Sequence, residues 1–592
     1  MSQPERPETD GEAVHQSRYV HGSSPTEQRR LEELSAWRKV MMTPVEVPVL
    51  IVGGGPVGLC ASLLLARHGV PSLLIERHPG ASLYPKARLV NTRSMEVFRQ
   101  IGLERAVRAI GLPPELARHA IWAKTLAGEE VRRVVLAMAD SDAMAALSPT
   151  LACTTSQEVL EPALLAAIGQ RGLGEVRFGC ELVTLSQDDA GVTATVLDRA
   201  GGEETYVRAR YLVGADGAHS RVRELLGIRM EGPAGLGHSI NILFRADLTP
   251  WVAGRSLNLC FIQQPGAAGV LLAVDGATRW YYQAFYFPSA GQRAEDFTPE
   301  RCVALLRAAM GVPDLAVEIA RVAPWSSAAR VAERFAEGRV FLMGDAAHEM
   351  PPAGGFGMNT GIQDAHNLAW KLAAVLGDWA GPALLDTYRD EREPVGRRVT
   401  EQTLANLTSL RRVDAGSAEE AGRPRDAGLR SGRPELFNEL GLIFGAAYAS
   451  AAVVPDGTLP PEVANPVTEY VPTASPGCRA PHIWLEHGGE RRSTLDLFGA
   501  AFVLLAGAAG EAWRREGLAV AAERHVPLHA YTVGPGGDLA DPDGTWPAAY
   551  GVECDGAVLV RPDGHVAWRA STAASKPRAT LDRVLAGVLG NG

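Results

Sequence analysis

The chain has 592 residues, of which 46% are hydrophobic and 21% charged, a balance typical of globular proteins with about three or four folded units of roughly 150 residues each. A net charge of −10 argues against a nucleic-acid-binding surface. The seven cysteines are far apart and form neither a C-x-x-C motif nor a metal-binding pattern with histidine, which predicts a reducing, cytoplasmic location and no metal site.

The N-terminal residues 1–44 are polar and lack the apolar core of a signal peptide, so we predict a disordered tail with one surface helix over residues 27–42. Residues 47–66 hold no charge over the length of a membrane span. Three consecutive glycines and two prolines in this stretch favour a buried strand and helix instead, and we expect no membrane association.

The strongest pattern begins with the apolar run 47–52 and the glycines Gly53, Gly55 and Gly58. Their G-x-G-x-x-G spacing lets a strand turn into a helix whose N-terminus faces a pyrophosphate. A second apolar run ends in Glu76, 23 residues after Gly53 (76 − 53 = 23), where a carboxylate can accept hydrogen bonds from a ribose. The pattern predicts dinucleotide binding; the alternative is a domain that keeps the loop and binds no nucleotide.

A second candidate site lies farther along the chain. A helix is predicted to begin near Ser156 and to carry Gln157, and strands are predicted over residues 176–180, 182–186, 192–197 and 206–213. The last strand leads into Asp216 and Gly217. Open α/β sheets bind ligands at the carboxyl ends of their strands, although a plain turn would explain the same residues.

Longer predicted strands follow over residues 238–248, 256–263, 269–274 and 279–287, which indicate an inserted antiparallel sheet. Alternation along the last of them places Trp280, Tyr282 and Tyr286 on one face and Tyr281, Phe285 and Phe287 on the other. One face could cover a flat substrate, and packing against a helix is the alternative. Tyr282 and Tyr286 are the candidate substrate-side residues.

The third pattern starts with a predicted strand over residues 340–343, followed by Gly344 and Asp345, a proline-containing loop and a helix over residues 359–376. Asp345 could accept hydrogen bonds from sugar-like hydroxyls. The loop glycines would let backbone amides and the helix N-terminus face an electron-rich ring. We expect His348 in this loop to be structural.

The C-terminal part is predicted as a helical connector and linker over residues 398–480, with a charged stretch at 414–433 and a proline-rich one at 454–481. The last unit, residues 481–592, reads strand, strand, helix, strand, a hairpin at Pro562-Asp563-Gly564 and a helix.

The segments GGGPVG, ADGAHSRVR and GDAAHEMPPAGGFGMN, in this order, resemble the three signatures of class A flavoprotein monooxygenases with the p-hydroxybenzoate hydroxylase fold. TPERCVALL, NLAWKLAAVLG and RRSTLDLFG are similar to stretches of bacterial aromatic polyketide hydroxylases. The resemblance implies an α/β fold: a Rossmann-like FAD-binding domain (residues 45–229 and 331–397), an inserted antiparallel-sheet substrate domain (230–330) and a C-terminal thioredoxin-like domain without C-x-x-C (481–592).

The resemblance also implies which residues contact FAD. These residues are Gly53, Gly55, Pro56, Val57, Gly58, Glu76, Arg77, Lys86, Arg88, Gln157, Asp216, Gly217, Arg223, Gly344, Asp345, Pro352, Gly355, Gly357, Met358 and Asn359. The chain differs from the family at one of these places. Many relatives have Pro-Arg-Ala where this chain has Pro85-Lys86-Ala87-Arg88, so either Lys86 or Arg88 could replace the arginine.

In this family NADPH or NADH reduces FAD, O2 adds to the reduced flavin, and the C4a-hydroperoxide transfers oxygen to an electron-rich aromatic carbon. The implied function is hydroxylation of a polycyclic, polyketide-type phenol by a cytoplasmic monomer or homodimer. A single-ring phenol, Baeyer–Villiger oxidation and epoxidation are alternatives, as is a non-catalytic FAD-fold binding module.

Overall fold

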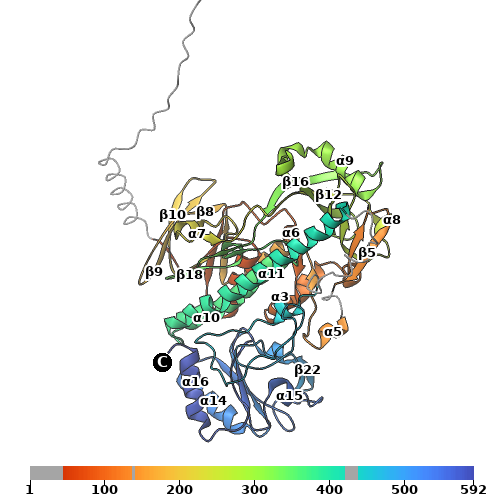
Figure 1. Ribbon diagram of the computed structural model, residues 1–592. Helices are drawn as coiled ribbons and strands as arrows, with labels where there is room; N and C mark the ends of the chain where they lie inside the picture. Colours follow the sequence, from red (N-terminus) through yellow and green to blue (C-terminus); the bar gives the residue numbers. More distant parts are fainter. Residues whose placement is uncertain (1–43, 137–140, 420–437, 592) are drawn as a thin grey trace, which may run out of the picture. The chain divides into compact units, whose positions relative to one another are not determined.

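The computed structural model describes residues 44–136, 141–419 and 438–591 (Figure 1). The predicted tail and its helix over residues 27–42 lie outside the described residues. Residues 420–433 of the predicted linker also lie outside the described residues. The first residues of that linker, 414–419, belong to the long helix α11 (Asp386–Glu419). Residues 46–592 form one compact unit.

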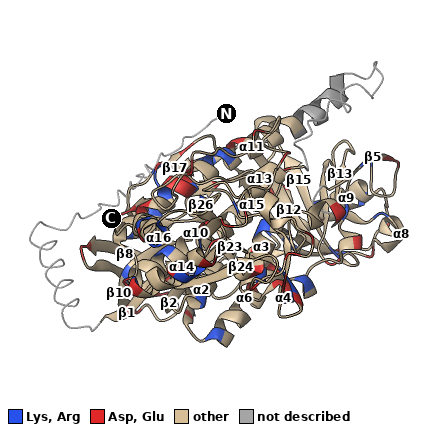
Figure 2. Cartoon of the chain, turned by 90° about the horizontal axis from the view of Figure 1, so that it is seen from below, with Lys and Arg blue, Asp and Glu red and all other residues tan. Residues whose placement is uncertain are grey.

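The largest sheets of the described residues have eight, seven and four strands, and Figure 1 labels most of the helices. The helices are α2 (Pro56–Arg67), α3 (Thr92–Gln100), α4 (Glu104–Ala109), α5 (Ser141–Ala145), α6 (Gln157–Arg171), α7 (Arg221–Leu225), α8 (Thr249–Val252), α9 (Pro299–Met310), α10 (Phe356–Leu376), α11, α13 (Leu440–Phe444), α14 (Glu511–Glu523), α15 (Trp546–Tyr550) and α16 (Pro577–Val588). None of these described helices is long and apolar enough to cross a bilayer. Acidic and basic residues are interspersed over the elements in Figure 2.

The first sheet is Rossmann-like, as predicted. Its order is β18-β19-β10-β1-β2-β7, and the pairs β1/β2, β2/β7 and β10/β19 are parallel. The strands are β1 (Val45–Val52), β2 (Ser72–Glu76), β7 (Gly174–Phe178), β8 (Cys180–Asp188), β9 (Gly191–Asp198), β10 (Glu204–Gly214), β18 (Ala336–Glu337) and β19 (Val340–Leu342). Helix α2 packs against both α6 and α10. The first, second and third sequence patterns follow β1, β10 and β19, so the topology brings them to one edge.

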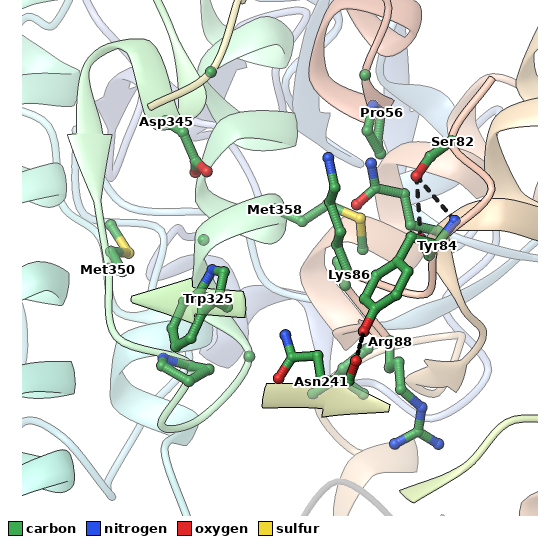
Figure 3. Close-up of a pocket in the computed structure, with 18 of the residues that line it drawn as sticks. Pro56, Ser82, Tyr84, Lys86, Arg88, Asn241, Trp325, Asp345, Met350 and Met358 are labelled. Carbon is green, nitrogen blue, oxygen red and sulfur yellow. Dashed lines mark hydrogen bonds between the residues drawn. The ribbon is translucent and has the colours of Figure 1, made fainter. Parts of the chain in front are cut away.

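The second sheet has the order β16-β12-β15-β14-β13-β4-β5 and is antiparallel except for the pair β13/β4. Its strands are β4 (His119–Ala123), β5 (Glu130–Val135), β12 (Gly237–Arg245), β13 (Leu257–Ile262), β14 (Gly269–Ala273), β15 (Arg279–Tyr286) and β16 (Glu318–Ser327). Strands β4, β5 and β16 were not predicted. One face packs on α9, and the other lines a cavity (Figure 3).

The C-terminal sheet has the thioredoxin-like order β24-β23-β25-β26. Strands β23 (Phe502–Gly507) and β24 (Leu528–Val533) are parallel, and β25 (Ala557–Val560) and β26 (Val566–Ala570) form the predicted hairpin. The first strand predicted in this unit does not join the sheet: β21 (Trp484–His487) pairs with β22 (Glu490–Ser493) in a separate hairpin.

Two buried arginines join the C-terminal part to the rest of the chain. Arg561 donates to both carboxylate oxygens of Glu391 on α11, at 2.6 and 2.9 Å. Arg479 binds the Glu96 carboxylate on α3, with 3.0 Å between Arg479 Nε and Glu96 Oε2. All four side chains are almost completely buried. Buried charges must be paired, because an isolated charge loses its hydration without compensation.

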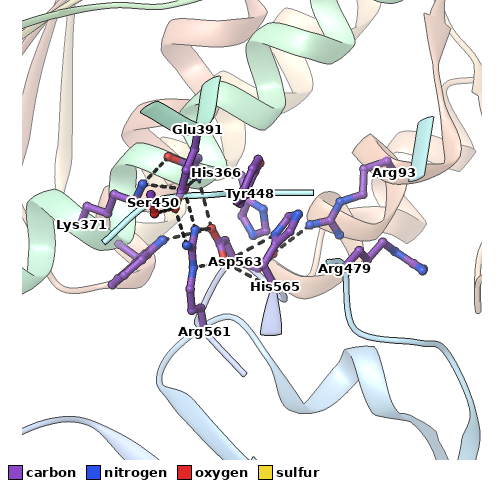
Figure 4. Close-up of polar contacts among 12 residues, drawn as sticks. Arg93, His366, Lys371, Glu391, Tyr448, Ser450, Arg479, Arg561, Asp563 and His565 are labelled. Carbon is purple, nitrogen blue, oxygen red and sulfur yellow. Dashed lines mark hydrogen bonds and ion pairs between the residues drawn. The ribbon is translucent and has the colours of Figure 1, made fainter. Parts of the chain in front are cut away.

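The surrounding side chains complete this polar network (Figure 4). Glu391 also accepts from Lys371 Nζ at 2.8 Å and Ser450 Oγ at 2.6 Å. Asp563, in the turn of the β25–β26 hairpin, binds Arg561 and accepts from Arg93 through its backbone carbonyl at 2.8 Å. Burial alone would raise the pKa of Glu391, but Arg561 and Lys371 hold it well below its ordinary value. The carboxylate therefore stays ionised inside the protein.

We expect Arg561→Met to destabilise the protein by on the order of 3 to 5 kcal/mol, because it removes the arginine that binds the buried Asp563 carboxylate and leaves Glu391 with Lys371 alone. Urea unfolding followed by circular dichroism measures the change. The control is Arg578→Met, which removes an exposed pair with Glu523 and should leave the unfolding midpoint unchanged. Equal effects of the two substitutions would contradict the importance of the buried network.

Candidate functional site

A cavity of about 2780 Å³ extends from the glycine turn after β1 to the open face of the second sheet (Figure 3). Pockets for drug-sized ligands usually measure roughly 300 to 1000 Å³. The cavity therefore has room for more than one organic ligand. Residues of all three sequence patterns lie on its wall.

The glycines bring the three patterns into direct contact. Gly53 has a φ of +111°, and a Cβ atom there would overlap the carbonyl oxygen of Ala215. A Cβ atom on Gly361 would lie 2.5 Å from Val57 Cγ2 and 2.9 Å from the Gly344 Cα. At Gly55, by contrast, a Cβ atom would meet nothing within 4 Å. The backbone of Gly55 thus faces open cavity at the N-terminus of α2.

Most residues implied by the resemblance line the cavity. They are Gly53, Gly55, Pro56, Val57, Glu76, Arg77, Lys86, Arg88, Gln157, Asp216, Gly217, Asp345, Pro352, Gly355, Gly357 and Met358. The structure places the other four behind the wall: Gly58, Arg223, Gly344 and Asn359.

Three of the residues behind the wall, Gly58, Arg223 and Asn359, contact segments that line the cavity. A Cβ atom on Gly58 would overlap the Gly53 carbonyl oxygen. Arg223 donates to the carbonyl oxygens of Ala346 at 3.0 Å and Ala218 at 2.8 Å, which ties the second pattern to the third. Asn359 accepts from the backbone N–H of Asn91 at 2.9 Å. Arg223 and Asn359 thus support the wall through hydrogen bonds to other segments, and their contact with a ligand stays a prediction.

Glu76 fixes the glycine turn. Its carboxylate accepts from the backbone N–H groups of Gly54 at 2.7 Å and His78 at 2.8 Å. Burial alone would raise the pKa of Glu76, but these hydrogen bonds lower it, so the group is ionised at neutral pH. A carboxylate offers about four acceptor sites, so capacity remains for a ligand hydroxyl.

Two charged side chains face the middle of the cavity without a hydrogen-bond partner among the described residues. Burial raises the pKa of the Asp345 carboxyl, while His348 and Lys86 oppose the shift. Lys86 also lowers the pKa of Glu161, which burial raises above its ordinary value. Both Asp345 and Lys86 line the cavity and appear on its wall in Figure 3. They are available to a ligand.

The structure separates Lys86 from Arg88. The guanidinium of Arg88 donates to the Ala273 carbonyl on β14 and points away from Asp345 in Figure 3. Lys86 is therefore the better placed of the two for a ligand beside Asp345, and Arg88 belongs to the sheet side of the cavity.

Helix α10 begins three residues earlier than predicted, at Phe356, after Gly355 with a φ of +71°. No side chain caps this end, so its first N–H groups and the positive end of the helix dipole are available to an electron-rich ligand. Gly357 and Met358 line the cavity here. In contrast, His348 is structural, as expected: its Nε2 lies 2.7 Å from Asp364 Oδ2 in the core.

The face of strand β15 that lines the cavity is mainly the one opposite to the candidate tyrosines. Tyr282 is fully buried in the core, does not line the cavity and donates to the Ala267 carbonyl at 2.5 Å. Tyr286 lies in the same core cluster but also lines the cavity. Tyr281, Phe285 and Phe287 line the cavity instead. The strand alternation was predicted correctly, but the choice of face was wrong for Tyr282.

Neighbouring strands add wall residues that the sequence analysis did not select. Tyr84, in the loop after β2, donates to the Asn241 carbonyl of β12 at 2.6 Å, and Trp325 of β16 pairs with Ser239 of β12. Gln283 Nε2 donates to Ser239 Oγ at 3.1 Å, which in turn lies 3.2 Å from Asn241 Oδ1. This polar row, Ser239, Asn241 and Gln283, is flanked by aromatic rings. In the sequence, Ser239 and Asn241 follow the alternation of β12, and Gln283 follows the alternation of β15 on the face of Tyr281 and Phe285.

The comparisons with known proteins agree with this geometry. Residues 46–403 match the FAD binding domain family and residues 473–592 the C-terminal domain of aromatic-ring hydroxylases. The tetracenomycin A2 monooxygenase-dioxygenase of Streptomyces glaucescens is 41% identical, over 92% of this chain and 98% of that protein.

Two solved structures have the same fold over 93% of this chain and their entire length. The flavin-dependent monooxygenase PieE, in complex with FAD and substrate, is 38% identical with a TM-score of 0.87. Aklavinone-11 hydroxylase, in a ternary complex with FAD and aklavinone, is 40% identical with a TM-score of 0.82.

We expect Gly53→Ala to lower the free energy of unfolding by about 1 to 3 kcal/mol, because the added methyl group would overlap the Ala215 carbonyl at a backbone position with positive φ. Gly55→Ala is the matched control: its methyl group projects into open cavity, so the ligand-free protein should unfold like the wild type. Thermal unfolding of the ligand-free proteins measures both. A stable Gly53→Ala variant would contradict the close contact.

Proposed function

Because the chain belongs to the FAD-dependent aromatic-ring monooxygenases, we propose that it hydroxylates a flat polycyclic phenol of the polyketide type, with NADPH or NADH as reductant and O2 as the oxygen source. The observation that carries the proposal is the single cavity that joins the glycine turn to an aromatic sheet face. Two relatives with polyketide names, tetracenomycin A2 monooxygenase-dioxygenase and aklavinone-11 hydroxylase, support this substrate class.

The wall of the cavity fits FAD on three observations. The open backbone at Gly55 accepts a pyrophosphate beside the N-terminus of α2. The unpaired Asp345 carboxylate suits the hydroxyls of a sugar-like chain, and Lys86 suits a neighbouring anionic group. The uncapped N-terminus of α10 suits an electron-rich ring. Gly55, Glu76, Lys86, Asp345 and the start of α10 would therefore hold the cofactor.

Bound FAD would supply the electron transfer and the activation of oxygen. The chain supplies the environment: the dipole of α10 stabilises negative charge, and a flat ligand stacked on the aromatic face would exclude water from the reacting end of the cavity. Only one glycine turn of the dinucleotide type follows a strand of the first sheet in the described part of the chain, so we infer that NADPH or NADH binds transiently without a domain of its own.

The sheet side of the cavity suits a flat, oxygen-substituted ring system. Tyr281, Phe285 and Trp325 offer stacking surfaces. Ser239, Asn241 and Gln283 offer hydrogen bonds to ring oxygens. A single-ring phenol would use only part of this surface, which favours a polycyclic one. Baeyer–Villiger oxidation and epoxidation remain alternatives with the same wall, and a non-catalytic binding module is the alternative of another class.

The test is to purify the protein, record its visible spectrum and follow NADPH and NADH oxidation with an anthraquinone-type phenol and with 2,4-dichlorophenol. We expect a flavin spectrum, faster oxidation with the polycyclic compound and a product heavier by one oxygen atom. Faster turnover of the single-ring phenol would favour that alternative. A protein that binds no flavin would contradict the enzyme proposal.

We expect Asp345→Ala to weaken FAD binding roughly 10- to 100-fold, because hydrogen bonds to a charged group contribute about 1.5 to 3 kcal/mol. Titration of flavin-free protein with FAD, followed by flavin fluorescence, measures the effect. Asp314→Ala removes an exposed carboxylate outside the cavity and serves as the control. Unchanged affinity in Asp345→Ala would exclude this carboxylate as a cofactor contact.

A further inference from the structure

Glu439 is an acidic side chain on the cavity wall that belongs to none of the three sequence patterns. Glu439 immediately precedes α13 and is only 5% exposed, yet it lines the cavity beside Leu407 of α11. A Cβ atom on Gly354 would lie 2.7 Å from Glu439 Oε1. The carboxyl group therefore packs directly against the loop that leads into α10, at the end of the cavity assigned to the flavin ring.

The two oxygens of this carboxyl group differ. Oε1 accepts a hydrogen bond from Asn406 Nδ2 at 2.7 Å, and the same nitrogen lies 3.4 Å from the Ala353 carbonyl oxygen. Oε2 has no hydrogen-bond partner within the described ranges. This oxygen is on the cavity wall, so it is available for a hydrogen bond with a ligand atom that enters the cavity.

The surroundings of Glu439 are apolar. The cluster of Phe356, Leu440, Leu442 and neighbouring residues packs beside it. Burial raises the pKa of Glu439 to about 8, and the hydrogen bond from Asn406 is the only opposing influence; no charged side chain of the described residues contributes. The group is thus a neutral acid at neutral pH and can donate a hydrogen bond.

We propose that Glu439 contacts the aromatic substrate and donates its carboxyl proton in a hydrogen bond to a ring oxygen, which orients the ring system at the flavin end of the cavity. The inference rests on the proposed function of the cavity. An apolar wall with one well-placed polar group is typical of the contact surface for an apolar ligand. The proposed cofactor contacts, in contrast, come from backbone N–H groups, Lys86 and the carboxylates of Glu76 and Asp345.

This role has a defined pH dependence. A carboxyl group with a raised pKa is protonated below that pKa, so the donor is present at neutral pH and is lost as the pH rises through about 8. The ionised form would also repel the oxygen that it faces. Substrate binding should therefore weaken above this pH, even for a ligand that does not itself titrate.

The experiment uses FAD-loaded protein and anthraquinone-2-sulfonate, whose carbonyl oxygens accept hydrogen bonds and whose charge is constant over this pH range. Its dissociation constant is measured by flavin fluorescence from below to above the Glu439 pKa. We expect the wild type to bind roughly tenfold more weakly on the alkaline side, and Glu439→Gln, which keeps a donor but cannot ionise, to lack this change. Glu401→Gln, an exposed position on α11, should behave like the wild type.

A second variant keeps the test decisive if Glu439→Gln does not fold. Because the Asn406 hydrogen bond lowers the pKa of Glu439, Asn406→Leu should move the midpoint of the binding change to higher pH. Flavin-loaded wild type whose probe binding does not vary with pH would overturn the inference and leave the proposed function intact. An effect of Glu439→Gln on FAD affinity alone would assign the residue to the cofactor and also overturn it. Protein that binds no flavin would overturn both.

Discussion

The site depends on a steric constraint: three distant segments of the chain approach so closely that only glycine fits between them. Gly53 lies against Ala215, and Gly361 against Val57 and Gly344. Strands β1, β10 and β19 end at the same edge of one sheet, and the contacts between the turns that follow these strands fix the positions of the turns. The cavity is what remains beside them, with the N-termini of α2 and α10 facing it. Side chains such as Arg223 and Asn359 stabilise the contacts from behind.

The C-terminal part extends this support. Its arginines Arg479 and Arg561 bind carboxylates on α3 and α11, and the hairpin turn at Asp563 lies against α10 through Trp370, whose Nε1 is 3.3 Å from Asp563 Oδ2. Helix α10 is one of the two helices whose N-termini face the cavity. A thioredoxin-like unit without a dithiol thus has a structural role here: its buried charges hold the far end of a helix whose near end belongs to the site.

Much of the site could be predicted because its signals are local. A strand, a glycine turn and a helix occupy neighbouring residues, so the patterns around Gly53, Asp216 and Gly344 are visible in one dimension. The alternation of β15 was equally visible, but alternation cannot say which face meets a helix and which meets a cavity. Tyr282 was selected for that reason, and packing against α9 buries it. The sequence could not decide whether Lys86 or Arg88 faces the cofactor side of the cavity. The two residues are only two positions apart in a predicted loop, where no periodicity indicates the direction of a side chain.

The sequence by itself determined the order of the elements, the three turns and the family resemblance, because backbone conformation at glycines and hydrophobic periodicity act over a few residues. The tertiary structure decided which side chains share the cavity. β4 and β5 join a sheet formed mainly by residues more than a hundred positions later, and Glu439 reaches Gly354 from beyond α11. Such contacts depend on packing between segments far apart in the chain, which periodicity and spacing do not encode.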